Sequence, residues 1–276
     1  MLTRIITAVV AVALFIPVLV FSNTLVFPLM MALLAVVGVA EMLKCVGNKK
    51  NAVSAVAVVI AAAAPVCARL VSDASLFVMA FAAVAFCFML YVFALAVFSH
   101  GKYDVTSACA DFALAMYVVV TFTSIVLLRD TVYGASLYLL AFLGPWVSDT
   151  AAYFCGFAFG KHKLIPDVSP KKTVEGAVGG AVFTAIAFAL YGALVLKPEA
   201  SLAPYIALAV IGFAVSVISQ IGDLIASLVK RKYGIKDYGK LFPGHGGVMD
   251  RFDSVLATAP ILLIASVLAA HFNLFG

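Results

Sequence analysis

The densest polar chemistry of this chain lies in KLFPGHGGVMDRFDS, residues 240–254. His245 stands beside glycines, and Asp250, Arg251 and Asp253 follow directly before an apolar run. Carboxylates bind hard divalent cations, and Mg²⁺ commonly takes one or two carboxylates together with substrate phosphates. The stretch therefore predicts cation-assisted phosphate chemistry at the start of a helix. A structural interpretation stays open, in which Asp250 pairs with Arg251 or Lys236 and Asp253 caps that helix.

A polar stripe precedes this stretch in an otherwise apolar segment. Ser216, Gln220, Asp223 and Ser227 are spaced by four, three and four residues, which places them on one face of a helix. A carboxylate inside a membrane costs about 3 kcal/mol on insertion scales, so Asp223 should face a partner or a water-filled cavity. We expect Asp223 and Asp250, on consecutive antiparallel helices, to share Mg²⁺, which takes one or two carboxylates together with substrate phosphates.

Two further acids lie in apolar segments. Asp149, in WVSDTAAYFCG, has polar neighbours and is followed by glycines that permit close helix approach, so it is a functional candidate. Asp111 is expected to satisfy a neighbouring polar group instead. The loop GKHKLIPDVSPKKTVEG, residues 160–176, is long, glycine-bearing and mixed in charge, which is typical of a functional loop or of a solvated cytoplasmic connector.

The elements that must position these residues are membrane helices. The 276 residues are 65% hydrophobic and 11% charged, with a mean hydropathy of +1.17, whereas soluble domains use about 25% charged residues. Apolar segments of about 18 residues can cross a bilayer, and nine of them predict an all-α, polytopic integral membrane protein. The first two could instead form a re-entrant pair. The nine segments are 5–22, 24–43, 52–71, 75–98, 105–128, 132–159, 176–196, 202–229 and 252–274.

The basic residues predict the orientation of these helices. Short cytoplasmic loops collect lysine and arginine, and nine spans with a cytoplasmic N-terminus put 15 of the 18 basic residues on that side. Only Arg69, Arg129 and Lys197 would lie outside. A basic face of this kind attracts lipid headgroups or a polyanionic ligand. We predict one membrane-embedded catalytic domain, 1–276, in which 1–130 is mainly scaffold and 131–276 carries the active-site loops and helices.

Residues 227–253 read SLVKRKYGIKDYGKLFPGHGGVMDRFD and resemble the signature of the phosphatidate cytidylyltransferases, also called CDP-diacylglycerol synthases. The segments SDTAAYFCGFAFGKHKL and SPKKTVEG are also similar to this family, whereas the first half matches only as a series of apolar helices. The matching signature positions are Ser227, Lys230, Arg231, Lys236, Asp237, Gly239, Phe242, Pro243, His245, Gly246, Gly247, Asp250, Arg251 and Asp253.

The resemblance implies a Mg²⁺-dependent membrane enzyme, a homodimer, that joins CTP and phosphatidic acid to give CDP-diacylglycerol and pyrophosphate. It implies Asp223 and Asp250 as metal ligands and leaves room for a second cation. Both substrates are anions, so catalysis would consist largely of charge neutralisation and positioning. The expected catalytic residues are Asp223, Asp250, Lys236, His245 and Arg251. The expected substrate-binding residues are Ser169, Lys171, Lys172, Thr173, Lys230, Arg231, Asp237, Gly246, Gly247, Asp253 and Asp149.

Within this set, the N–H groups of Gly246 and Gly247 would approach a phosphate, and His245 would contact a phosphate or protonate the leaving group. We expect a bacterial inner-membrane protein whose site faces the cytoplasm, with membrane lipid around it and no nucleic acid as a partner. Two rival functions remain open. One is a CTP-dependent kinase of a polyprenol or phytol, and the other is a transporter of an anionic solute.

Overall fold

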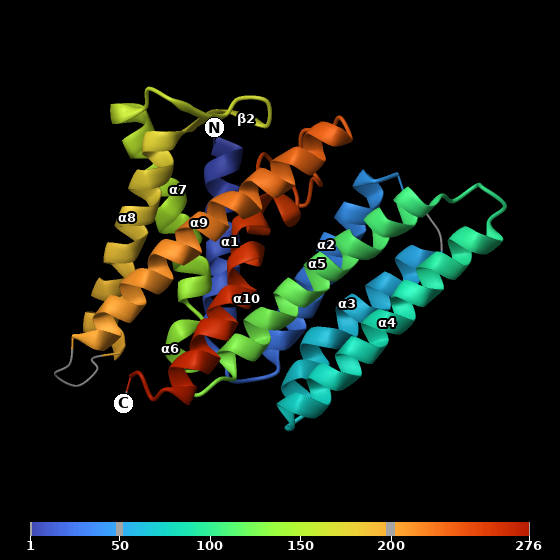
Figure 1. Ribbon diagram of the computed structural model, residues 1–276, viewed down its shortest axis with the longest axis horizontal. Helices are drawn as coiled ribbons and strands as arrows, with labels where there is room; N and C mark the ends of the chain where they lie inside the picture. The colour runs from blue at the N-terminus through green and yellow to red at the C-terminus, as the bar shows by residue number, and fades with distance from the viewer. Residues whose placement is uncertain (1, 48–51, 197–201, 276) are drawn as a thin grey trace. The chain divides into compact units, whose positions relative to one another are not determined.

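The computed structural model describes residues 2–47, 52–196 and 202–275 and is almost entirely helical (Figure 1). Lys49, Lys50 and Lys197, which entered the orientation argument, lie outside these ranges. The helices and strands are α1 Leu2–Val20, α2 Val26–Cys45, α3 Ala52–Leu70, α4 Ala74–Phe98, α5 Val105–Arg129, α6 Gly134–Leu137, α7 Leu140–Phe159, β1 Lys163–Ile165, β2 Ser169–Thr173, α8 Val174–Tyr191, the π-helical turn η1 Gly192–Leu196, α9 Ala203–Lys232 and α10 Met249–His271.

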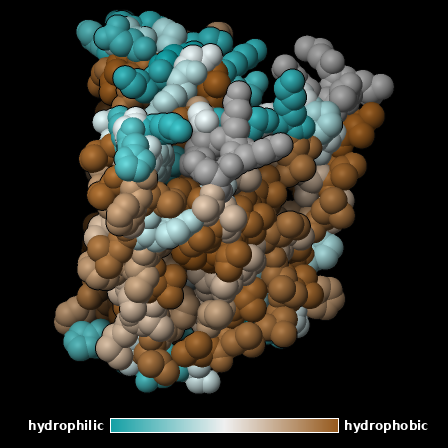
Figure 2. All heavy atoms as spheres, turned by 90° about the vertical axis from the view of Figure 1, so that its right-hand side faces the viewer, coloured by the Kyte–Doolittle hydropathy of each residue, from teal (hydrophilic) through white to brown (hydrophobic). Residues whose placement is uncertain are grey.

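Seven helices in the described part of the chain are long and apolar enough to cross a membrane, namely α2, α3, α4, α5, α8 with η1, α9 and α10. On the face shown in Figure 2, hydrophilic residues gather along the upper edge, and apolar residues cover most of the surface below it. These observations confirm an all-α, polytopic membrane protein, but the predicted count of nine spans is not confirmed. In α1 only the shorter stretch Val9–Val20 is apolar enough. The segment 132–159 divides into α6 and α7, and polar residues such as Asp149 lower the hydropathy of α7.

The chain separates into two compact units. The first contains Met1–Leu127 and Tyr233–Arg251, and the second contains Leu128–Lys232 and Phe252–Gly276. The loop before α10, residues 233–248, is called the signature loop below, and it groups with the N-terminal helices. Helix α10 begins in the first unit and continues in the second. The predicted single domain, with a scaffold that ends near residue 130, stays a prediction.

In the first unit, α2 packs against α1 and α3, and α3 packs against α4. Asp111 of α5 is buried and accepts a hydrogen bond of 2.7 Å from the hydroxyl of Tyr103. This contact confirms that Asp111 satisfies a neighbouring polar group. Burial of the Tyr103 phenol, together with this bond to Asp111, raises the pKa of Tyr103 above its usual value.

In the second unit, α7, α8 and α9 pack against one another, and the two-stranded hairpin lies at one end of α7 and α8 (Figure 1). The strands are antiparallel, with Lys163 opposite Thr173 and Ile165 opposite Ser169. Glycines permit the close contact of α7 and α8, because a Cβ on Gly156 would lie 3.6 Å from the Cα of Gly176 and 2.8 Å from Thr173 Oγ1. The predicted role of the glycines after Asp149 is thereby confirmed.

Candidate active site

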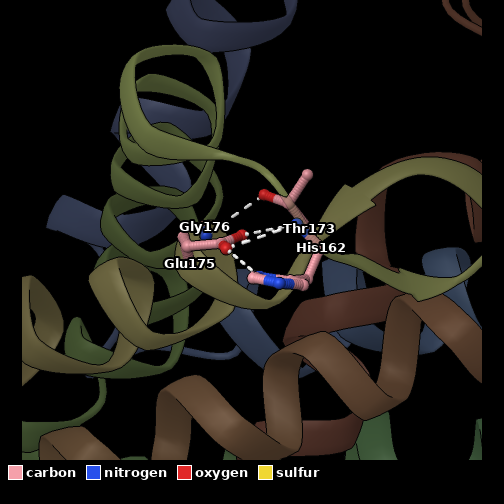
Figure 3. Close-up of polar contacts among 4 residues, drawn as sticks. All are labelled: His162, Thr173, Glu175 and Gly176. Atoms are coloured by element: carbon pink, nitrogen blue, oxygen red, sulfur yellow. Dashed lines mark hydrogen bonds and ion pairs between the residues drawn. The ribbon is translucent and has the colours of Figure 1, made fainter.

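The hairpin is fastened to the first turn of α8 (Figure 3). Thr173 caps this helix, since its Oγ1 accepts a hydrogen bond of 3.2 Å from the N–H of Gly176. The Glu175 carboxylate accepts hydrogen bonds of 3.3 Å from the backbone N–H of His162 and lies 2.6 Å from its Nδ1. These contacts connect both ends of the loop 160–176 to one helix end. The position of the basic residues of β2 is therefore fixed relative to the start of α8.

The polar stripe predicted from the sequence lies on α9 and is joined to three neighbouring elements. Ser216 and Ser148 of α7 form a hydrogen bond between their hydroxyls, 2.7 Å apart. Gln220 donates to Ser216 Oγ and to the carbonyl of Ala177 on α8, both at 3.1 Å. One turn further along the stripe, the Nζ of Lys172 lies 2.6 Å from Asp223 Oδ2. The buried part of the stripe thus fixes α9 against α7 and α8, and its outer part meets a basic residue.

A cavity of about 430 Å³ opens where this outer part meets the hairpin. Its polar lining combines Asp149 of α7, Lys171 and Lys172 of β2, Thr173, and Asp223 of α9. Lys172 and Asp223 are half-buried, whereas Lys171 is exposed. Five residues that the sequence predicted as functional therefore line one cavity in the second unit. Gln220 lines it as well.

Three carboxylates in the second unit, Asp149, Asp223 and Asp253, are close enough for their charges to interact. Lys172 and Lys230 counter part of this negative charge. Among the described residues, no three His, Cys, Asp or Glu side chains stand close enough together to hold a metal alone. Mg²⁺ commonly takes only one or two carboxylates and completes its shell with water and phosphates. The donors present here therefore suit an ion that arrives with a phosphorylated ligand.

In the first unit, Asp250 is held by the signature loop. Its Oδ2 accepts hydrogen bonds from the N–H groups of Tyr238, at 2.8 Å, and of Gly247, at 2.9 Å. Gly246 has φ +87°, a conformation that favours glycine, and a Cβ on it would lie within 3 Å of Asp250 side-chain atoms. The loop therefore folds its backbone tightly around one carboxylate. The N–H of Gly247, predicted to approach a phosphate, donates to Asp250 here.

The tip of the signature loop is a narrow turn. His245 N–H donates to the carbonyl of Phe242, and Phe242 N–H donates to the carbonyl of Gly246. The Nε of Arg251 donates to the carbonyl of His245 at 2.7 Å. His245 Nδ1 is buried and has no hydrogen-bond partner among the residues that the structure describes. The backbone of this turn is thus fixed around His245 and Arg251, two of the predicted catalytic residues.

One structural alternative for the acids of α10 is wrong. Asp253 does not cap the helix, because α10 begins four residues earlier, at Met249. Its Oδ1 accepts a hydrogen bond from the N–H of Ser254 instead. Asp250 and Asp253 lie in the first turns of α10, three residues apart, a spacing that places both on one face.

The remaining predicted residues are divided between the two units. In the second unit, Ser169 begins β2 outside the described lining of the cavity, and Lys230 and Arg231 end α9. In the first unit, Lys236 and Asp237 are exposed in the signature loop. Asp223 and Asp250 belong to different units, so the metal ion that they are predicted to share stays a prediction. The roles assigned to the individual site residues also stay predictions.

Glu41 of α2 is a candidate that the sequence analysis missed. It is only 8% exposed, and its carboxylate accepts hydrogen bonds from the N–H groups of Val248 and Met249 at 3.1 and 2.9 Å. A signal was present, because Glu41 is the only acidic residue in the segment 24–43. Intramembrane carboxylates are rare and mark functional positions by default.

The chain is similar along nearly its whole length to one family of known proteins. A family profile described as "Cytidylyltransferase family" matches residues 2–269. The chain is 33% identical over 268 residues to the phosphatidate cytidylyltransferase of Staphylococcus saprophyticus, covering 96% of this chain and 98% of that protein. Proteins of the same name from Bacillus subtilis and Brucella suis are 40% and 43% identical over 149 residues. In these two cases the match spans about half of each chain, 54% of this one and 54% and 53% of the relatives.

The profile match reaches through the N-terminal helices, which the sequence motifs alone did not cover. It also spans both compact units, so the cavity at Asp223 and the turn around Asp250 lie within one family match. The chain therefore belongs to the cytidylyltransferase family and is, by that membership, a nucleotidyltransferase.

Proposed function

We propose that this enzyme is a phosphatidate cytidylyltransferase, which joins CTP and phosphatidic acid to form CDP-diacylglycerol and pyrophosphate. The name of the relative that aligns along almost the whole chain supports these substrates. The structural observation that carries the proposal is the cavity at the hairpin, where Lys171 and Lys172 stand beside Asp149 and Asp223. Lysines can bind phosphate oxygens, and carboxylates can hold the cation that accompanies a nucleoside triphosphate.

The volume and the lining of the cavity support a nucleotide phosphate chain as its ligand. Its volume of about 430 Å³ falls within the roughly 300 to 1,000 Å³ of small-molecule sites. Tyr153, Phe157 and Leu164 line the same cavity together with the charged residues. On the same helix α7, an apolar groove of about 720 Å³ is lined by residues such as Trp146, Phe154 and, from α8, Phe183. This groove supports a lipid as the second substrate.

The ion pair between Lys172 and Asp223 suggests how the ligand is received. The two charges neutralise each other across 2.6 Å. A triphosphate offers Lys172 a stronger anion, and the accompanying cation offers Asp223 a stronger partner. Binding therefore exchanges one ion pair for two, and little charge stays uncompensated at any stage. Thr173 and Gln220 hold the surrounding backbone in place during this exchange.

The reaction that we propose is an in-line substitution at phosphorus. A phosphate oxygen of phosphatidic acid attacks the α-phosphorus of CTP, the new P–O–P bond forms, and the bond from the α-phosphorus to the bridging oxygen of pyrophosphate breaks. The attacking phosphate is already largely ionised near neutral pH, so no strong base is needed. Mg²⁺, when bound, would neutralise charge on the phosphates and orient them. We propose Asp223 and Asp250 as its ligands, with a second cation as an option.

The other predicted residues take supporting roles in this proposal. Lys236 and Arg251 neutralise phosphate charge, and His245 contacts a phosphate or protonates the departing pyrophosphate. We also propose that the protein lies in a bacterial inner membrane with the site toward the cytoplasm, and that it forms a homodimer. The many basic residues next to the predicted active-site helices support this orientation.

Labelled CTP tests the proposal against its closest rival. The purified protein is incubated with phosphatidic acid and with CTP labelled on the α- or the γ-phosphate. We expect label in lipid only from the α position, together with one pyrophosphate released per lipid formed. Label in lipid from the γ position would identify a CTP-dependent lipid kinase instead. Movement of an anionic solute across vesicles without pyrophosphate release would identify a transporter.

A further inference from the structure

We propose that Glu41 is a positioning residue for the reaction, which holds the backbone turn that presents Asp250 at the start of α10. The inference deepens the proposed function, because it rests on Asp250 being part of the active site. The inference rests on the hydrogen bonds of three consecutive backbone N–H groups. Gly247 donates to Asp250, and Val248 and Met249 donate to the two oxygens of Glu41. One turn is thus held by two carboxylates from opposite ends of the sequence.

The need for such a partner follows from helix geometry. The first N–H groups of an α-helix have no acceptor within the helix, and α10 begins at Met249. Val248 and Met249 are fully buried, so solvent cannot satisfy these donors. A carboxylate at a helix N-terminus also interacts favourably with the helix dipole. Glu41 meets both needs from α2, more than 200 residues away in the sequence.

The glycines of the signature loop fit the Glu41 side chain closely. A Cβ on Gly239 or on Gly247 would overlap Oε1 of Glu41. For Gly247, the three nearest atoms to such a Cβ all belong to the Glu41 carboxyl group. Thr7 of α1 makes a further contact with the signature loop, since its hydroxyl donates a hydrogen bond to the carbonyl of Pro243 at 3.1 Å. The N-terminal helices therefore shape the loop.

Both oxygens of Glu41 accept backbone hydrogen bonds inside the fold, and the residue is 8% exposed. It is therefore placed to act through the loop and not by touching a substrate. Glutamine at this position would retain one acceptor and turn an N–H₂ group toward the other backbone donor. We therefore expect Glu41→Gln to loosen the turn while the rest of the helix bundle stays folded.

The first experiment compares wild type, Glu41→Gln and Glu41→Ala in purified, detergent-solubilised protein. Hydrogen exchange at Val248 and Met249 should become about tenfold to a hundredfold faster in both variants. The kcat with CTP and phosphatidic acid should fall by a similar factor, and the Mg²⁺ concentration for half-maximal rate should rise several-fold. Asp73→Ala is the matched control, because Asp73 also accepts from two backbone N–H groups at a helix start, that of α4. It should leave both kinetic constants unchanged.

A double-mutant cycle tests the direct contact. Gly247→Ala alone should lower kcat about as much as Glu41→Ala, because the new methyl group displaces the carboxylate. In the Glu41→Ala background this space is open, so adding Gly247→Ala should lower kcat by less than about threefold further. Strictly multiplicative losses in the double variant would overturn the proposed coupling.

The activity and hydrogen-exchange measurements distinguish a failure of the proposed function from a failure of the positioning role. A wild type that forms no CDP-diacylglycerol refutes the proposed function, whereas hydrogen exchange still decides whether Glu41 holds the turn. Unchanged exchange at Val248 and Met249 in Glu41→Gln overturns the positioning role. Faster exchange with wild-type kcat and wild-type Mg²⁺ dependence overturns it too, because Glu41 would then only stabilise the fold.

Discussion

Two acidic regions of this enzyme are supported in different ways. At the start of α10, Glu41 and Asp250 accept four hydrogen bonds from backbone N–H groups. On α9, Asp223 is paired with Lys172, and both line a cavity. Backbone donors at a helix end cannot move without disturbing the fold, whereas a lysine ammonium on a four-carbon stem can change partners. We therefore expect the first region to keep its shape and the second to exchange its ion pair for contacts with a ligand.

Asp250 and Asp223, which the sequence predicts alike as metal ligands, are expected to differ in their contributions to stability and activity. We expect Asp250 to contribute to both, because it is a proposed metal ligand and also accepts hydrogen bonds from the backbone of Tyr238 and Gly247 in the signature loop. We expect Asp223 to contribute little to stability, because the negative charges of Asp149 and Asp253 oppose its attraction to Lys172. Changing each carboxylate to its amide, at nearly constant volume, tests this distinction.

The largest effect is expected for Asp223→Asn and Asp250→Asn. Each should lower kcat by about 10³-fold or more, because several kcal/mol of electrostatic stabilisation are lost. Only Asp250→Asn should also reduce the free energy of unfolding, by about 1 kcal/mol, through weaker bonds to the loop N–H groups. Asp223→Asn should unfold at the wild-type temperature or slightly above it. Initial rates and thermal unfolding in detergent measure both quantities.

Two outcomes would break this part of the comparison. If either variant kept most of its activity, that residue would not be a metal ligand. If both variants lost the same stability, the distinction between a fixed and an exchanging carboxylate would be wrong, whatever their rates.

A smaller effect is expected for the lysines of β2. Lys172→Met should lower kcat/KM for CTP about tenfold to a hundredfold, because a half-buried, charge-assisted contact is lost. Lys171→Ala should raise KM only a few-fold, because this exposed side chain is screened by solvent. Steady-state kinetics at two salt concentrations check both expectations, and only the Lys171 effect should shrink at high salt. Equal effects of the two variants would show that the contribution of each lysine does not depend on its burial.

The sequence predicted most of the helices because their signal is strong. Long apolar segments, the polar stripe on α9 and the glycines of α7 depend on local periodicity, and the structure confirms them. The sixth predicted span was less well described, because a break near residue 138 separates α6 from α7 within one apolar segment. A hydropathy pattern contains no information on that break.

The candidate site was only partly predictable for a different reason. Asp149 and Asp223 stand out by charge in their apolar segments, and they line one cavity with Lys172, which belongs to a loop rich in charge. Glu41 also stands out by charge, but its structural role depends on a contact with Val248, 207 residues later in the chain. Nothing in the spacing of either segment indicates that pairing. Local pattern therefore finds the residues that carry charge, whereas tertiary structure shows which of them support the others.

The smallest effect is expected at the outer edge of the hairpin, where His162 meets Glu175. The His162 side chain is 78% exposed, so replacing it with alanine should change kcat and KM by no more than about a factor of three. Thr173→Ala is the matched comparison on the same support, because Thr173 both caps α8 and lines the cavity. It should raise KM for CTP more than His162→Ala does. The reverse order would mean that the hairpin is positioned from its solvent-exposed side, and the cavity at Lys172 would then be less rigidly supported than the contacts of α8 indicate.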